Sequence, residues 1–153
     1  MSNSSKIKWL IDPSSESWLR QALANPMDIL LDHAHCERKA AGVAMQLMFR
    51  YIGESGLSEV LSPLAREELE HYERVLALLG SRGKQLLPLP APPYGSVLSK
   101  NIRKEEPLRM LDSFLVAGLI EARRHERMSL LALHFPDNEL RILYQELLKS
   151  EAR

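Results

Sequence analysis

The stretch REELEHYERV, residues 66–75, contains four glutamates and one histidine within a helical pattern. Glu68 and His71 are three positions apart, so their side chains project from one face of a helix about one turn apart. One interpretation is a pair of ligands for one metal ion, and the other is a solvated helix surface. Chance alone gives about 0.5 Glu-x-x-His occurrences in a chain of this composition, so the motif by itself favours the surface.

The sequence around this stretch predicts an all-α chain. Long amphipathic helices are expected over residues 28–53, 58–80, 105–135 and 136–153, after a shorter helix with serine caps in residues 12–24. We expect Pro63 to start or bend the second long helix, and Asp137 or Asn138 to cap the fourth. The proline-dense residues 85–97 are expected to be extended. Two helix pairs separated by a long crossover predict a four-helix bundle.

Composition bounds the class of protein. A chain of 153 residues is long enough for a core, and we expect a single domain spanning residues 1–153. The 20 basic and 20 acidic side chains cancel, so net charge does not indicate binding of polyanions. The single cysteine, Cys36, excludes a disulfide framework, and no apolar leader or membrane span is evident. We therefore expect a soluble cytoplasmic protein.

Each long predicted helix places one glutamate on its apolar face, and these residues are Glu37, Glu68, Glu121 and Glu151. Burying an unpaired carboxylate costs several kcal/mol, and a pair of divalent cations would neutralise all four. The first two glutamates lie 31 positions apart and the last two 30, which indicates two copies of one helical hairpin. As a set, with His71 in register, the residues favour a metal site over a charged surface.

The second hairpin lacks one element of this pattern. A matching histidine would stand three positions after Glu151, but the sequence ends at Arg153. The fourth predicted helix is also shorter than its partners. We therefore expect a C-terminal truncation, with the second Glu-x-x-His completed by a residue after Arg153.

Four stretches, residues 30–51, 64–79, 103–132 and 147–153, resemble the tRNA isopentenyladenosine hydroxylase family. The blocks Asp-His-Ala-His-Cys-Glu (32–37) and Ile-Glu-Ala-Arg-x-x-Glu-Arg (120–127) carry most of the specificity, and the resemblance covers nearly the whole chain from about residue 8. Members are ferritin-like di-iron monooxygenases that hydroxylate the prenyl group of 2-methylthio-isopentenyladenosine next to the anticodon. The resemblance thus implies a ferritin-like four-helix bundle and a tRNA substrate.

The resemblance also implies the cofactor and its ligands. The iron ligands would be Glu37, Glu68, His71, Glu121 and Glu151, with a sixth, a histidine, missing from the end. By analogy with such bundles, Glu37 and Glu151 would be terminal ligands, and Glu68 and Glu121 bridging ones. Two iron ions would use dioxygen as co-substrate and take electrons from an external donor, such as a reductase or a ferredoxin-type protein. Carboxylate and imidazole donors suit iron or manganese.

Several neighbouring residues have two interpretations. His33 and His125 lie one turn from predicted ligands, where they either support the site or pack in the core. His35 is expected at the surface, and Glu126 in a surface salt bridge. Two basic groups either meet RNA phosphates or form ordinary solvated faces: Arg123, Arg124 and Arg127, and Lys100, Arg103 and Lys104.

Two alternatives to the tRNA hydroxylase stay open. The first is another ferritin-like metal protein, namely a ferroxidase, a peroxidase or a manganese catalase. The second is a metal-free structural bundle in which the glutamates pair with arginines. Activity on prenylated tRNA separates the first alternative, and metal analysis separates the second.

Overall fold

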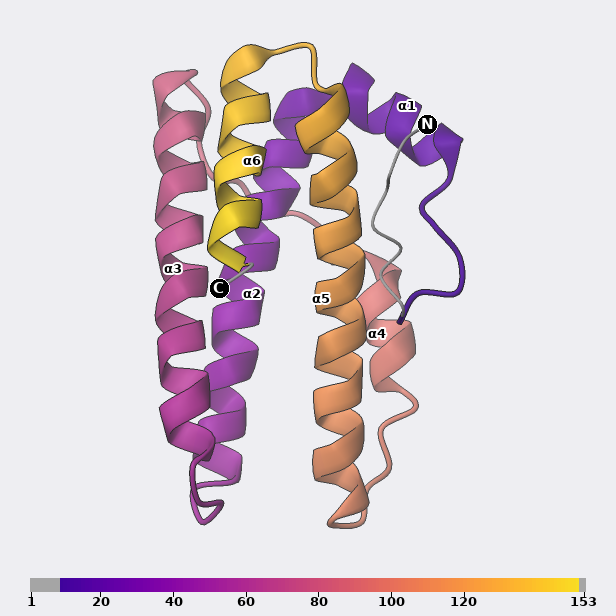
Figure 1. Ribbon diagram of the computed structural model, residues 1–153, viewed down its shortest axis with the longest axis vertical. Coiled ribbons are helices and arrows are strands. Elements are labelled where there is room, and N and C mark those ends of the chain that lie inside the picture. Colours follow the sequence, from indigo (N-terminus) through magenta and orange to yellow (C-terminus); the bar gives the residue numbers. More distant parts are fainter. Residues whose placement is uncertain (1–8, 152–153) are drawn as a thin grey trace. The chain divides into compact units, whose positions relative to one another are not determined.

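The computed structural model describes residues 9–151, which form six helices and no strand. The helices are α1 (Glu16–Ala24), α2 (Pro26–Arg50), α3 (Leu57–Ser81), α4 (Pro93–Ser99), α5 (Leu108–His134) and α6 (Asn138–Glu151), as labelled in Figure 1. The prediction of an all-α chain is confirmed. The chain divides into two compact units, one comprising Asn25–Pro90 and the other the segments before and after it.

The first unit is a hairpin of α2 and α3, which run antiparallel along almost their whole length (Figure 1). Gly56 has a φ of +81°, a left-handed conformation that glycine adopts without steric cost, and it sits directly before α3. Alanines on the inner face of α2, including Ala34, Ala41 and Ala44, are at most 4% exposed. Small side chains at these positions allow the two helices to approach closely.

The ends of the hairpin helices differ from those predicted. The helices were expected to stop at Gly53 and Gly80, but α2 ends at Arg50 and Gly80 lies inside α3. The turn after α3 instead uses Gly83, whose φ is +68°, and the amide of Lys84 donates to the carbonyl of Leu79 at 3.0 Å. This bond is typical of a glycine-terminated helix.

Pro63 lies inside α3. The helix begins at Leu57 and continues through the proline, so of the two alternatives for Pro63 a helix start is wrong, and a bend at this position stays a prediction.

The crossover after α3 is only partly extended. Residues 84–92 have no helix, as expected, but residues 93–99 form α4, which the proline content had concealed. Pro93 is compatible with this helix because it occupies the first helical position, where no amide donor is needed. Earlier in the crossover, the carbonyl of Leu87 accepts a hydrogen bond of 2.7 Å from Nε2 of His35, which fixes the segment against α2.

The second unit pairs α5 with α6. The carboxylate of Asp137 accepts bonds from the amides of Glu139 and Leu140 at 3.0 and 3.2 Å, so Asp137 is the predicted cap of α6. Phe135 and Tyr144 stack with ring centroids 5.6 Å apart, and both are almost completely buried. The described part of α6 has 14 residues and α5 has 27, so α6 pairs only with the C-terminal half of α5 (Figure 1).

The segment before α1 is bound to α5 in the same unit. The hydroxyl of Ser15 caps α1 by accepting from the amide of Trp18 at 3.1 Å, which confirms a predicted serine cap. Ser14 donates to Glu126 from both its amide, at 2.8 Å, and its hydroxyl, at 2.7 Å. Glu126 also pairs with Arg123 at 3.2 Å, and its side chain is only 13% exposed. The expected salt bridge therefore exists, and it lies under this segment rather than on the open surface.

An ion pair fastens the connection between α4 and α5. The amide and Nε of Arg103 donate to one oxygen of Asp112 at 2.9 and 2.8 Å, and Nη2 donates to the other at 2.7 Å. These side-chain and backbone hydrogen bonds from Arg103 lower the pKa of Asp112 to about 2. The same pair raises the pKa of Arg103.

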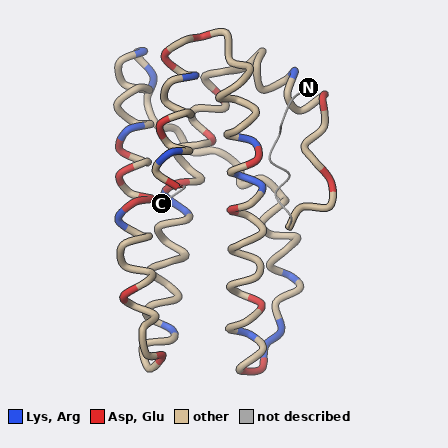
Figure 2. Tube along the Cα trace, in the orientation of Figure 1, with Lys and Arg blue, Asp and Glu red and all other residues tan. Residues whose placement is uncertain are grey.

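Both signs of charge are distributed along both units (Figure 2), in keeping with a net charge of zero. Among the helices of residues 9–151, none combines the length and hydrophobicity needed to cross a bilayer.

The Arg103–Asp112 pair predicts a measurable titration. A carboxyl group whose pKa is depressed in the folded state adds stability above its unfolded pKa of about 3.9, and this contribution is lost as pH falls towards 2. In the Arg103→Gln variant we expect the Asp112 pKa to return towards its ordinary value, as followed by NMR chemical shifts. Glu105→Gln is the control, and it should leave the Asp112 pKa within a few tenths. An Asp112 pKa near 4 in the unmodified chain would contradict the pairing.

Candidate metal centre

Three of the predicted ligands lie buried in the α2–α3 hairpin. Glu37 on α2 is 0% exposed, and Glu68 and His71 on α3 are 4% and 1% exposed. Apolar neighbours flank Glu37 along its helix, with Ala34 and Ala41 one turn either side of it. The prediction that these side chains point into an apolar interior is therefore confirmed for this hairpin.

Two histidines contact Glu37. Nε2 of His33 lies 2.6 Å from Oε1 of Glu37, and because a carboxylate only accepts, this nitrogen is the donor. Nδ1 of His71, from the facing helix, lies 3.9 Å from the same oxygen. Of the two interpretations of His33, the structure therefore supports a role in holding the predicted ligand.

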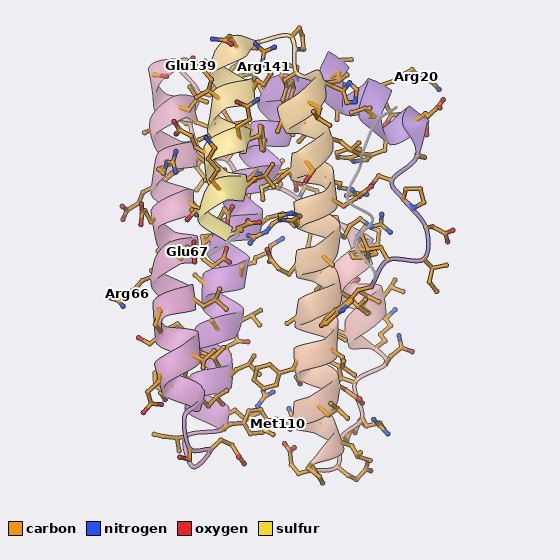
Figure 3. The ribbon with its side chains drawn as sticks, in the orientation of Figure 1. Arg20, Arg66, Glu67, Met110, Glu139 and Arg141 are labelled. Carbon is orange, nitrogen blue, oxygen red and sulfur yellow. The ribbon has the colours of Figure 1, made fainter. Side chains whose placement is uncertain are left out.

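The α3 side of this cluster includes one further carboxylate. Oε1 of Glu67 lies 3.9 Å from Nε2 of His71, and the Glu67 side chain is 35% exposed. Figure 3 labels Glu67 and the preceding Arg66, whose side chain points away from the hairpin. Successive residues of α3 thus divide between solvent and the interior, as a period of 3.6 residues requires.

The donors of the α2–α3 cluster, defined as His33, Glu37, Glu68 and His71, fit a metal such as iron or manganese. Carboxylate oxygens and imidazole nitrogens are the ligand types that these ions take. Two donors that each lie about 2.1 Å from one ion are separated by roughly 3 to 4 Å. The 3.9 Å between Glu37 and His71 lies within that range.

The second unit holds the other two predicted ligands in a different environment, the α5–α6 cluster of Glu121, Arg124, His125 and Glu151. Nη2 of Arg124 lies 2.6 Å from Oε1 of Glu121 and 3.6 Å from Oε1 of Glu151. His125 donates from Nδ1 to Glu151 at 2.8 Å. This hydrogen bond raises the pKa of His125, against the opposing effect of burial.

Glu121 is less buried than the sequence predicted. Its side chain is 42% exposed, whereas Arg124 is 8% and Glu151 is 11% exposed. Glu151, the last described residue of α6, contacts Arg124, which lies one turn of α5 after Glu121. Glu121 thus lies half-exposed beside Arg124, and its role as a ligand stays a prediction.

Three arginines of α5 contact other residues of the second unit. Arg123 donates to the carbonyl of Asp12 at 2.8 Å, and the guanidinium of Arg127 lies 4.6 Å from the centre of the Trp18 ring. With Arg124 held by two glutamates, the expectation of a merely solvated basic face is wrong for this group. In the second basic group Lys100 and Lys104 are exposed, and Arg103 is bound to Asp112.

Sequence reasoning misplaced one histidine and missed one bridging residue. His35 is 6% exposed, not at the surface, because it binds Leu87 of the crossover and its Nδ1 accepts from Arg38 at 3.2 Å. Arg124 was assigned to the basic group, although its spacing of three positions from Glu121 is the spacing of a helical ion pair. That spacing was the available signal for its role.

The His33–Glu37 contact predicts a loss of stability on substitution. In His33→Ala a buried carboxylate loses a charge-assisted hydrogen bond, and we expect a cost of about 1.5–3 kcal/mol in the free energy of unfolding. Urea denaturation with matched m-values measures it. His134→Ala, which removes an exposed histidine at the end of α5, should change stability by less than about 0.5 kcal/mol. Equal effects of the two substitutions would contradict the role of His33.

Comparison with known proteins identifies the family. Residues 2–153 match the family model described as tRNA-(MS[2]IO[6]A)-hydroxylase (MiaE). A tRNA 2-(methylsulfanyl)-N(6)-isopentenyladenosine(37) hydroxylase of Pseudomonas putida is 43% identical over 141 residues, which cover 92% of this chain and 68% of that protein. The enzyme of the same name from Salmonella typhimurium is 27% identical, over 96% of this chain and 72% of its own length.

A solved structure is also similar. It is titled "Protein 43 with aldehyde deformylating oxygenase activity from Synechococcus", is 68% identical, and superposes with a TM-score of 0.93 over 96% of this chain and 73% of that one. The family match and the two hydroxylases confirm the predicted family and its reaction, hydroxylation of 2-methylthio-isopentenyladenosine in tRNA. The chain with its buried Glu/His cluster therefore belongs to the tRNA-(MS[2]IO[6]A)-hydroxylase (MiaE) family of tRNA-modifying enzymes.

Proposed function

We propose that the chain performs this hydroxylation with two iron ions, held by Glu37, Glu68, His71, Glu121 and Glu151 in a ferritin-like four-helix bundle. The burial of Glu37 beside two histidines is the observation that carries the proposal. In it, the α2–α3 and α5–α6 hairpins form one domain, and each hairpin contributes carboxylates. The matched spacing of the glutamates in the two halves supports this arrangement.

The iron would supply the oxidising chemistry. With dioxygen, two electrons from an external donor and two protons, one oxygen atom enters an allylic C–H bond of the prenyl group as hydroxyl and the other leaves as water. A ferredoxin-type protein or a reductase is the proposed donor.

The residues of the chain have separate tasks in this proposal. Glu37, Glu68 and His71 bind metal from the first hairpin, and the hydrogen bond from His33 fixes one carboxylate oxygen of Glu37. In the second hairpin, Arg124 holds Glu121 and Glu151 near each other. A cation that binds these two carboxylates has to share them with the guanidinium. The apolar walls of the helices exclude water from the reacting groups.

A second candidate function is aldehyde deformylation. It is favoured by the 68% identity to a solved protein whose title carries that activity. The two reactions differ in substrate, one a nucleoside in RNA and the other an aldehyde. An iron–carboxylate core serves either reaction, so the choice between them lies in the groups that admit the substrate.

Metal analysis tests the ligand set. We expect the iron-reconstituted chain to hold about two iron ions, and Glu68→Gln, which keeps the side-chain shape, to lose at least about half of this iron. Glu70→Gln is the matched control because Glu70 is exposed on the same helix, and its iron content should not change. Circular dichroism checks that both variants remain folded. Unchanged iron in Glu68→Gln, or a chain that binds none, would support the metal-free bundle instead.

Parallel substrate assays test the reaction. The iron-loaded chain receives dioxygen and a reductant with either a prenylated anticodon stem-loop or an aliphatic aldehyde. We expect hydroxylated nucleoside, detected by mass spectrometry, and formation at least about tenfold faster than formate release from the aldehyde. The reverse ratio would favour deformylation. Peroxide or ferrous-ion turnover without either product would favour a catalase, peroxidase or ferroxidase.

A further inference from the structure

The ring of Trp9 packs against α5 at Gly118. A Cβ atom added to Gly118 would lie 2.7 Å from Cζ3 of the Trp9 ring, closer than real Cβ contacts, and 3.6 Å from each of the two ring carbons beside Cζ3. These are the distances expected when an aromatic ring meets a helix edge-on, since a ring lying flat would bring the neighbouring carbons to about 3 Å. The indole therefore meets Gly118 with one edge of its ring rather than with a ring face.

The segment that carries Trp9 is fixed to α5 by polar contacts. We call residues 9–15 the N-terminal strap. Its Asp12 carbonyl accepts from Arg123 at 2.8 Å, and its Ser14 donates to Glu126 from amide and hydroxyl. Arg127 donates from Nε to the Ser14 hydroxyl at 3.2 Å. The strap is thus bound over more than one turn of α5, and Trp9 lies three residues from the nearest of these contacts.

Packing alone does not account for this arrangement. Trp9 is 61% exposed, although a tryptophan that served only as a core residue would be mostly buried. A glycine inside a helix costs up to about 1 kcal/mol relative to alanine, and here it makes the notch for a ring that stays in solvent. Trp18, the other tryptophan, has a ring face covered by Arg127.

We propose that Trp9 is a stacking platform for an unpaired base of the tRNA anticodon loop. This rests on the tRNA substrate of the proposed function. Proteins that read single-stranded RNA stack its bases on exposed aromatic rings, because every base has a π-face. Trp9 is 61% exposed and belongs to an anchored segment, so the ring is accessible and little ordering is needed on binding.

A fluorescence titration tests the proposal directly. In the full chain carrying Trp18→Phe, Trp9 is the only tryptophan. We expect an unmodified anticodon stem-loop to quench its emission with saturation, because a base stacked on indole quenches it. Trp9→Ala should weaken binding of the stem-loop about tenfold, measured by filter binding, and Trp9→Phe should recover part of this loss.

Two further variants separate stacking from a structural role. Gly118→Ala displaces the ring from its notch, and we expect it to weaken RNA binding in the same direction as Trp9→Ala. Ile11→Ala is the matched control, since Ile11 is a 98% exposed apolar residue of the same strap without a ring, and it should bind as the unmodified chain does. In steady-state assays Trp9→Ala should raise KM for tRNA with kcat unchanged.

Three outcomes would overturn the proposal. The first is equal RNA binding by Trp9→Ala and the unmodified chain. The second is a loss of kcat with KM unchanged, which would place the effect in the fold or the metal centre. The third is a change of Trp9 emission with protein concentration and none with RNA, which would assign the ring to contact between copies of this chain. If the unmodified chain neither binds nor modifies tRNA, the proposed function fails as well, and that result is distinct from these three.

Discussion

The structure depends on carboxylates that are kept inside an apolar hairpin. Glu37 is 0% exposed on a helix whose neighbouring inner positions are alanine and leucine, and Glu68 faces inward from α3. A lone carboxylate in such surroundings costs several kcal/mol, which is a large share of the net stability of a domain of this size. The hairpin therefore retains these residues only with partners that neutralise them. For Glu37, the two helices provide the histidines at positions 33 and 71.

The two units meet the same constraint with different chemistry. The α2–α3 cluster places imidazoles beside its carboxylate, and imidazole is a metal ligand as well as a hydrogen-bond donor. The α5–α6 cluster uses Arg124, which can donate hydrogen bonds and supply charge but cannot ligate a metal. The first hairpin thus offers carboxylate and imidazole groups of the kinds that bind metals, whereas the second holds its carboxylates with a guanidinium.

The surface of the second unit carries Trp9, the residue that we propose contacts the substrate. The chain is similar both to tRNA hydroxylases and to a protein with aldehyde deformylating oxygenase activity, so one fold accompanies activities on unrelated substrates. Selectivity then has to come from groups outside the core. The N-terminal strap is one such element, because its hydrogen bonds to Arg123 and Glu126 hold it on α5 while Trp9 remains in solvent. Gly118 of α5 leaves room for the Trp9 ring, because a Cβ atom at this position would lie 2.7 Å from it.

The sequence by itself determined the four long helices, the inward positions of Glu37, Glu68 and His71, and the family, because helical periodicity and short motifs are local properties of the chain. It did not reveal the short helix α4. It did not determine where helices stop, as Gly80 and Gly83 illustrate, since either glycine satisfies the local pattern and the hydrogen bond from Lys84 to Leu79 selects one. Only the tertiary structure decided that His35 is buried against the crossover, that Arg124 joins two glutamates, and that Glu121 stays half-exposed. Each of these depends on a partner far along the chain or on how far a neighbouring helix extends, and periodicity within one helix carries no information about either.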